Sequence, residues 1–162
     1  MSIEKVRAYL EPLGAAEKIQ EFSVSSATVE LAAQALGVEG ARIAKTLSFL
    51  VEDRAVLLVA AGDTKVDNSK FKAFFHTKAK MLTPEQVEEL VGHAVGGVCP
   101  FGVNPGVKVY LDESLRRFET VFPACGSANS AIELTIPELE RLSRFDAWVD
   151  LCKLWRPEEA QP

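Results

Sequence analysis

The sequence is short of the residues from which metal and thiol sites are built. It has two histidines, His76 and His93, and no cysteine or histidine pair stands at metal-ligand spacing. Its three cysteines, Cys99, Cys125 and Cys152, are odd in number and widely spaced, which suits a reducing compartment and indicates no disulfide framework. We therefore expect a protein that needs no metal and no cofactor.

The sequence also lacks a net positive charge and long apolar runs. The net charge is −5 and the sequence pI is about 5.2, which argues against DNA binding or tight, charge-driven RNA binding but leaves open contact with one end of a nucleic acid. No apolar run approaches the roughly 18 residues of a membrane span, and the first residues do not resemble a secretory signal. We expect a cytoplasmic protein without membrane contact.

Helix and strand signals occur in mixed order, and the apolar content of 48% is enough for a sizeable core. Apolar spacing and caps predict helices at 2–13, 25–38, 67–75, 83–92, 136–142 and 145–155. Apolar runs predict strands at 18–22, 42–51, 55–61, 107–112, 119–124 and 131–135, with a hairpin turn at 52–54. The order indicates a single α/β domain over 1–156, with a mixed, partly antiparallel sheet flanked by helices, and a flexible tail at 157–162.

One lysine interrupts the most apolar strand, "RIAKTLSFLV". Lys45 is expensive to bury without a partner. One interpretation is a strand lysine whose stem packs on the core while its amine reaches water. The other is an amine at the floor of a pocket, where its donors face an anionic or carbonyl oxygen. Alternation along the strand places Thr46 on the opposite face.

A shaped loop follows the predicted helix 83–92. Four of the ten glycines fall between Gly92 and Gly102, without the spacing of a Walker or dinucleotide motif. Cys99 lies in this loop, either as a nucleophile with His93 as its partner or, as we favour, as a small buried residue.

Cationic residues cluster over residues 65–80. This cluster is either a solvated face or a limited contact with phosphate groups. Its members are Lys65, Lys70, Lys72, His76, Lys78 and Lys80.

The pairing of "IAKTLSFLV" with the later "VGGVCPFG" resembles the YbaK/ProX family, which comprises free-standing relatives of the editing domain in bacterial prolyl-tRNA synthetases. The specific features are the lysine strand around Lys45 and the Gly-x-x-x-Pro loop from Gly96 to Pro100. The resemblance covers nearly the whole chain and implies an editing-domain-like α/β fold. It also implies hydrolysis of a mischarged aminoacyl-tRNA, with the acceptor end and a prolyl-tRNA or other synthetase as partners.

The resemblance further implies site residues. Lys45 would be the catalytic residue, and the loop would hold the ester and the terminal adenosine through backbone groups. The implied substrate-binding residues are Gly96, Gly97, Val98, Cys99, Pro100, Phe101, Thr46, Gly126 and Ser127. Ala124 and Ala131 stand where the cysteinyl-specific branch has a serine and an aspartate, so cysteine, alanine, serine and threonine all remain open as the amino acid. A non-catalytic module that binds tRNA ends or a synthetase is the alternative.

Overall fold

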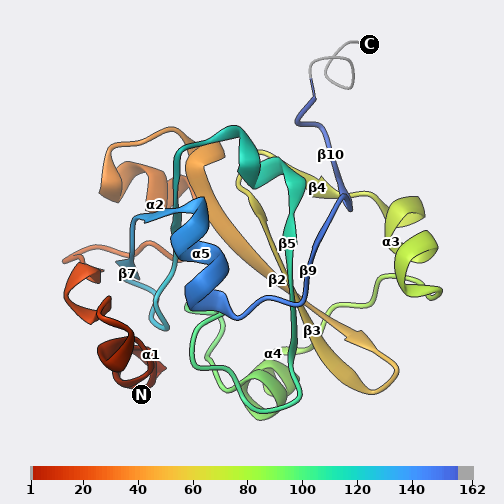
Figure 1. The fold of residues 1–162 in the computed structure, drawn as a ribbon, viewed down its shortest axis with the longest axis horizontal. Helices are drawn as coiled ribbons and strands as arrows, with labels where there is room; N and C mark the ends of the chain where they lie inside the picture. Colours follow the sequence, from red (N-terminus) through yellow and green to blue (C-terminus); the bar gives the residue numbers. More distant parts are fainter. Residues whose placement is uncertain (1, 157–162) are drawn as a thin grey trace.

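The structure, a computed structural model, describes residues 2–156, so the expected tail at 157–162 lies outside the described residues. Its centre is a sheet with six strands among these residues, in the order β8-β6-β2-β3-β5-β9 (Figure 1). The sheet is mixed: β2 pairs with β3 and β6 with β8 in antiparallel fashion, whereas the β2–β6, β3–β5 and β5–β9 pairs are parallel. The predicted α/β class is confirmed.

A long hairpin forms the middle of this sheet. Strand β2 (Ile43–Val51) turns at Glu52 and Asp53, which both have positive φ, and returns as β3 (Arg54–Ala61). The two strands pair without interruption from Ala44 opposite Ala61 to Val51 opposite Arg54. Strand β3 is buried along almost its whole length because other elements cover both faces of the sheet.

The outer strands come from the second half of the chain and from short flanking segments. The sheet is completed by β5 (Lys108–Asp112), β6 (Thr120–Pro123), β8 (Leu134–Thr135) and β9 (Ala147–Val149). Two small ladders lie outside it: β1 (Gln20–Glu21) with β7 (Ser130–Ala131), and β4 (Lys65–Val66) with β10 (Cys152–Lys153).

Local sequence signals set most helix ends. The helices are α1 (Ser2–Leu10), α2 (Val29–Leu36), α3 (Asn68–Phe75), α4 (Pro84–Gln86) and α5 (Ile136–Ser143). Thr28 and Asp67 cap α2 and α3, and Thr83 and Thr135 each form a capping box with the residue three positions on. A 3₁₀ turn extends α1 to Leu13, so the first predicted helix ends in a tighter turn. A π turn (Val87–Val91) continues α4, so the helix predicted at 83–92 ends in a wider one.

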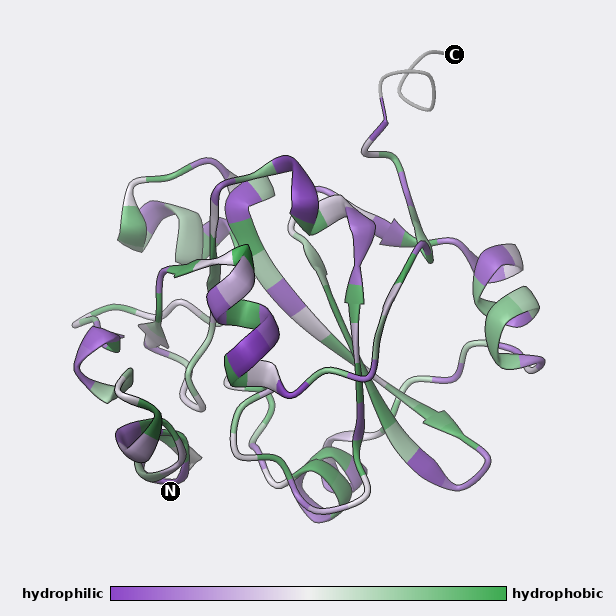
Figure 2. Cartoon of the chain, in the orientation of Figure 1, coloured by the Kyte–Doolittle hydropathy of each residue, from purple (hydrophilic) through white to green (hydrophobic). Residues whose placement is uncertain are grey.

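The two faces of the sheet bury different helices. Figure 2 shows hydrophobic residues along the central strands and a mixture of hydrophobic and hydrophilic residues in the helices. Leu57 and Val59 pack with α1 and α5 on one face, whereas Leu58 and Phe49 pack with Phe71 of α3 on the other. None of the helices within 2–156 is both long and apolar enough to cross a membrane.

The predicted helix at 145–155 is wrong. This segment forms β9 and β10, because its start is hydrogen-bonded to strand β5 of the sheet. The Asp146 N–H donates to the Val109 carbonyl over 2.7 Å, and the Asp146 carboxylate accepts from the Val109 N–H over 2.7 Å. The predicted strand 131–135 also differs, since β7 and β8 join two different sheets.

Asp112, the last residue of β5, connects this strand to the segment 145–155. Its fully buried carboxylate accepts from the Ser114 N–H over 3.0 Å and from the Leu151 N–H over 2.9 Å. Replacing it by alanine leaves two buried donors without partners, so we expect Asp112→Ala to lower the free energy of unfolding by about 2–4 kcal/mol in urea titrations. Exposed Glu119→Ala is the control and should change it by less than about 0.5 kcal/mol. Equal values for both variants would contradict this role.

Candidate functional site

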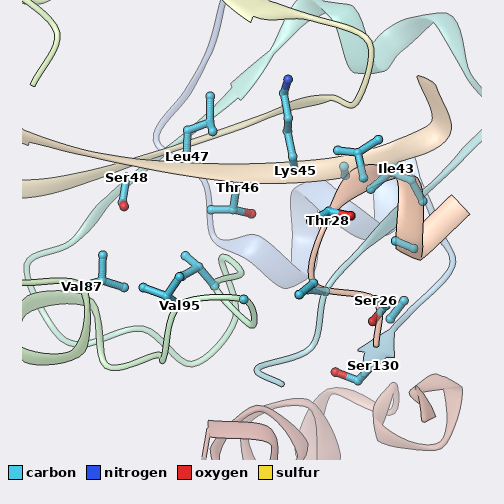
Figure 3. A pocket seen from close by; sticks show the side chains of 18 of the residues that line it. Ser26, Thr28, Ile43, Lys45, Thr46, Leu47, Ser48, Val87, Val95 and Ser130 are labelled. Carbon is cyan, nitrogen blue, oxygen red and sulfur yellow. The ribbon is translucent and has the colours of Figure 1, made fainter. Parts of the chain in front are cut away.

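A cavity of about 460 Å³ opens beside β2 (Figure 3). Its walls come from β2, the segment leading into α2, the segment around α4, and the two loops at 95–98 and 124–131. The lining residues are Ser26, Ala27, Thr28, Val29, Ala32, Ile43, Ala44, Lys45, Thr46, Leu47, Ser48, Met81, Leu82, Pro84, Val87, Val95, Gly96, Val98, Phe122, Ala124, Ser130 and Ala131.

The edge of β2 is open where it meets this cavity. Strand β6 pairs with β2 only at Ile43 and Ala44, and a bridge to Met81 resumes pairing at Phe49. Between these points, no strand within 2–156 pairs with β2 on this side. An unpaired edge presents backbone donors and acceptors to whatever lies beside it.

Thr46 lies on the open stretch of this edge, between Ala44 and Phe49. The backbone groups of Ser48 and Leu50 on the same side bond to Leu82 and Lys80, and strand groups alternate with a period of two. The N–H and C=O of Thr46 therefore point to the open edge. The hydroxyl oxygen of Thr46 is buried and has no hydrogen-bond partner among the described residues, and its side chain points to the cavity side of the strand together with that of Ser48 (Figure 3).

Lys45 lines the cavity, but its side chain leaves β2 on the other face, alongside that of Leu47 (Figure 3). The predicted separation of Lys45 and Thr46 onto opposite faces is confirmed. The Lys45 amine donates to the backbone carbonyl of Thr64. Burial lowers the pKa of this amine, while Cys152, Asp63 and Glu30 oppose the shift and Lys65 adds to it. The lysine is thus held by one hydrogen bond, with two further donor positions on its ammonium.

The glycine loop contributes to the cavity through only part of the predicted set. Gly96 and Val98 line it, and neither N–H has a hydrogen-bond partner among residues 2–156. Gly97 and Pro100 are buried behind the cavity wall, and the N–H of Gly97 donates to the Ala94 carbonyl. The two available donors, the N–H groups of Gly96 and Val98, are therefore separated by one residue on the cavity wall.

Close contact with the second loop fixes the position of this wall. A methyl group on Gly97 would lie 2.4 Å from the backbone carbon of Gly126 and 2.5 Å from the nitrogen of Ser127, so only glycine fits. Neither Gly126 nor Ser127 lines the cavity. Both residues contact Gly97 from behind and so support the wall rather than form it. The Ser127 hydroxyl donates over 2.8 Å to that of Ser130, which does line it.

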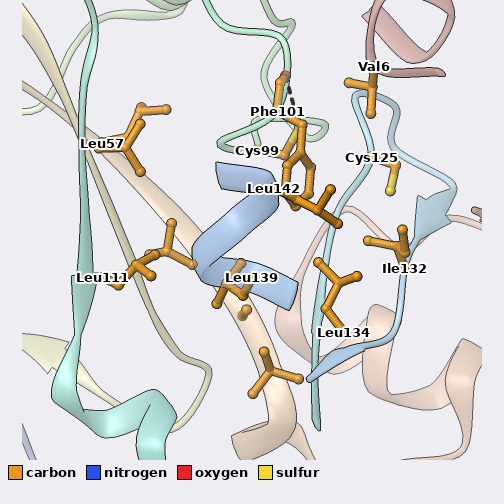
Figure 4. Close-up of a cluster of buried hydrophobic side chains, with 14 of the residues drawn as sticks. Val6, Leu57, Cys99, Phe101, Leu111, Cys125, Ile132, Leu134, Leu139 and Leu142 are labelled. Atoms are coloured by element: carbon orange, nitrogen blue, oxygen red, sulfur yellow. Dashed lines mark hydrogen bonds between the residues drawn. The ribbon is translucent and has the colours of Figure 1, made fainter. Parts of the chain in front are cut away.

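Cys99 and Phe101 belong to the core rather than to the cavity, as Figure 4 shows. The Cys99 sulfur lies 3.6 Å from Nε2 of His93, but both groups also contact the Phe101 carbonyl and both are buried. Burial raises the pKa of the Cys99 thiol to about 12 and lowers that of His93. A neutral thiol beside a neutral imidazole is no activated nucleophile, so the buried interpretation of Cys99 is confirmed.

Sequence reasoning missed the polar side chains on the cavity side of β2 and in the segment before α2. Ser26, Thr28 and Ser48 line the cavity. The first two lie in a segment that was interpreted only as helix caps, and the alternation of Thr46 with Ser48 was the available signal for the third. Within residues 2–156, no group of three or more His, Cys, Asp or Glu side chains could hold a metal ion.

Comparisons with known proteins agree on one family. The model for the aminoacyl-tRNA editing domain matches residues 24–142. The uncharacterized protein YwhH of Bacillus subtilis (strain 168) is 53% identical over 156 residues, covering 96% of this chain and 99% of its own. The proline–tRNA ligase of Geobacillus sp. (strain WCH70) is 30% identical over 142 residues, which are 87% of this chain but 24% of the ligase.

Solved structures show the same fold. A crystal structure described as a candidate trans-editing enzyme for prolyl-tRNA synthetase has a TM-score of 0.84 and 34% identity, covering 94% of this chain and 98% of that one. The hypothetical protein APE2540 has a TM-score of 0.81 and 25% identity, covering 92% and 99%.

The thiols give a direct test of the site chemistry. Burial raises the pKa of Cys99 and Cys152 to about 12 and that of Cys125 well above its usual value. At pH 8 almost no thiolate forms, so we expect Ellman's reagent to label none of these cysteines rapidly in the native protein and all three in denaturant. Rapid native labelling that disappears in Cys99→Ala would show that this thiol is activated.

Proposed function

We propose that this chain, which belongs to the aminoacyl-tRNA editing domain family, is a free-standing hydrolase that cleaves the ester of mischarged aminoacyl-tRNA. The amino acid is a small one, carried on tRNA(Pro), and the reaction takes place in the cytoplasm. The chain spans about a quarter of the ligases it matches, so only their editing function is carried over. The observation that carries the proposal is a cavity whose wall presents hydrogen-bond donors that have no partner within residues 2–156.

These donors suit an ester that is already activated. Hydrolysis requires attack of water on the ester carbonyl, negative charge on the carbonyl oxygen, and departure of the ribose oxygen, which takes up a proton. The N–H groups of Gly96, Val98 and Thr46 are available to stabilise the developing charge. A neighbouring ribose hydroxyl of the substrate assists the water, so the protein needs no strong nucleophile of its own.

Lys45 has a positioning role beside the ester in this mechanism. Its amine already donates to the Thr64 carbonyl, which orients the ammonium, and its other donors bind the phosphate of the terminal nucleotide. Because residues from both faces of β2 line the cavity, a substrate can contact Thr46 on one side of the strand edge and Lys45 on the other.

Deacylation assays test this function. We expect the purified protein to release alanine, cysteine or serine from tRNA(Pro), and Lys45→Ala to lower kcat/KM by about 100-fold because misplacing the ester removes most of the benefit of orientation. Lys108→Ala is the matched control: Lys108 is also a strand lysine, and its amine lies 3.6 Å from the Asp146 carboxylate.

Circular dichroism should show that both lysine variants remain folded. Activity of Lys45→Ala within twofold of wild type would remove Lys45 from the mechanism. Binding of tRNA ends by the wild-type protein, with no hydrolysis of any tested ester, would instead indicate the non-catalytic module.

Selectivity follows from the wall of the cavity. Ala124 and Ala131 line it without offering a side-chain hydrogen bond, so size is the main discriminator. One methylene in such a pocket is worth about 1–3 kcal/mol, so we expect moderate preference among alanine, cysteine and serine, and rejection of bulky residues and proline. Single-turnover rates on tRNA(Pro) carrying each amino acid measure this. A preference above about a thousandfold for serine would show that a hydroxyl such as that of Ser26 or Ser48 recognises the side chain.

A further inference from the structure

Two lysines face each other across the small ladder of β4 and β10. Lys65 of β4 is the direct partner of Lys153 of β10 in antiparallel register. Directly opposed residues put their side chains on the same face, with Cβ atoms about 4.5–5.5 Å apart, and like charges in this arrangement repel. Both side chains are exposed, and neither amine has a hydrogen bond or ion pair within residues 2–156.

Lys45 places a third ammonium near Lys65, whose positive charge contributes to lowering the pKa of the Lys45 amine. Its amine donates to the carbonyl of Thr64, the residue immediately before Lys65. Lys45 lies on the face of β2 that carries Leu47 and Phe49 and that α3 covers, away from Thr46. The three lysines come from β2, β4 and β10, so the fold assembles them from distant parts of the sequence.

Glu30 also acts on the charge of Lys45, but two other carboxylates of this region, Asp63 and Asp150, are engaged with arginine or with another lysine. Asp63 receives two hydrogen bonds from the Arg117 guanidinium, at 2.6 and 3.0 Å. Asp150 accepts from Arg156 over 2.7 Å and from Lys70 over 3.2 Å. Lys65 and Lys153 therefore carry positive charge that no carboxylate within residues 2–156 pairs with, in a chain whose net charge is −5.

We propose that Lys45, Lys65 and Lys153 form a binding site for phosphodiester groups of the single-stranded 3′ end of tRNA. This inference rests on the proposed function, since it takes the ester to lie in the cavity on the other side of β2. The open edge at Thr46 gives the nucleotide chain a path from the cavity to the lysines. An anion between Lys65 and Lys153 relieves their repulsion, and contacts to the backbone position the tRNA without reading its sequence.

The test compares two double variants with equal loss of charge. Lys65→Ala/Lys153→Ala removes the opposed pair, and Arg54→Ala/Lys108→Ala removes two cations at the hairpin end of the sheet, where Lys108 pairs with Val56. Each is assayed on mischarged tRNA(Pro) and on the matching aminoacyl-adenosine, which has no phosphodiester. Unfolding titrations confirm that both proteins fold.

We expect the first variant to raise KM for the tRNA substrate about tenfold at low salt, with kcat unchanged, because two exposed charge contacts are lost. The slope of the logarithm of tRNA affinity against the logarithm of salt concentration should fall in magnitude by about 1.4 in this variant. Each lost contact with a single-strand phosphate contributes about 0.7 to this change. Its kinetics on aminoacyl-adenosine, and all kinetics of the second variant, should match wild type. Unchanged KM and salt slope for tRNA, or an equal loss on both substrates, would overturn the proposal.

A binding measurement separates this inference from the proposed function. If the wild-type protein hydrolyses neither substrate, the proposed function fails, and fluorescence anisotropy with a labelled RNA oligonucleotide ending in CCA decides the lysine site. Binding that weakens about tenfold in Lys65→Ala/Lys153→Ala but not in Arg54→Ala/Lys108→Ala supports the site. Equal binding by both variants, or no binding by wild type at low salt, overturns it.

Discussion

The uninterrupted pairing of β2 with β3 is the constraint on which the site depends. It fixes which face of β2 each side chain occupies, and a shift of one residue would exchange Lys45 with Thr46. The pairing also leaves the other edge of β2 to be covered by β6 at one end and by the Met81 segment at the other. In the uncovered stretch of β2 between Ala44 and Phe49, a ligand can reach the backbone groups of the strand and the side chains on both of its faces.

The loops across the cavity are held by contacts that make the wall rigid. Gly97 meets Gly126 with no room for a side chain, and the loop that contains Gly126 is tied to the N-terminal part of the chain. The N–H of Ser26 donates to the Ala128 carbonyl over 2.6 Å, and the Asn129 amide donates to the Phe22 carbonyl over 2.9 Å. Residues from three distant segments thus hold one wall, which suits a mechanism that relies on positioning.

Sequence patterns predicted the elements with strong local signals, and tertiary contacts decided the others. Thr28 and Thr83 mark helix starts because caps act within a few residues, and the hairpin follows from two apolar runs and a short turn. The segment 145–155 has helical spacing, but bonds to distant strand β5 make it extended. The same limit applies to the site: Lys45 and Gly96 were recognisable as a pair, whereas the open edge of β2, the place of Ser48 and the opposition of Lys65 to Lys153 depend on register and topology.

The buried hydroxyl of Thr46 has a consequence for the stability of the protein without its substrate. A buried polar group without a hydrogen bond costs about 1–3 kcal/mol, and the Thr46 hydroxyl has no hydrogen-bond partner among the residues that the structure describes. A ligand that accepts or donates a hydrogen bond there removes this penalty only in the folded state. A ligand that bonds to the Thr46 hydroxyl should therefore raise the melting temperature of the protein, so thermal unfolding can report binding in this cavity without any measurement of hydrolysis.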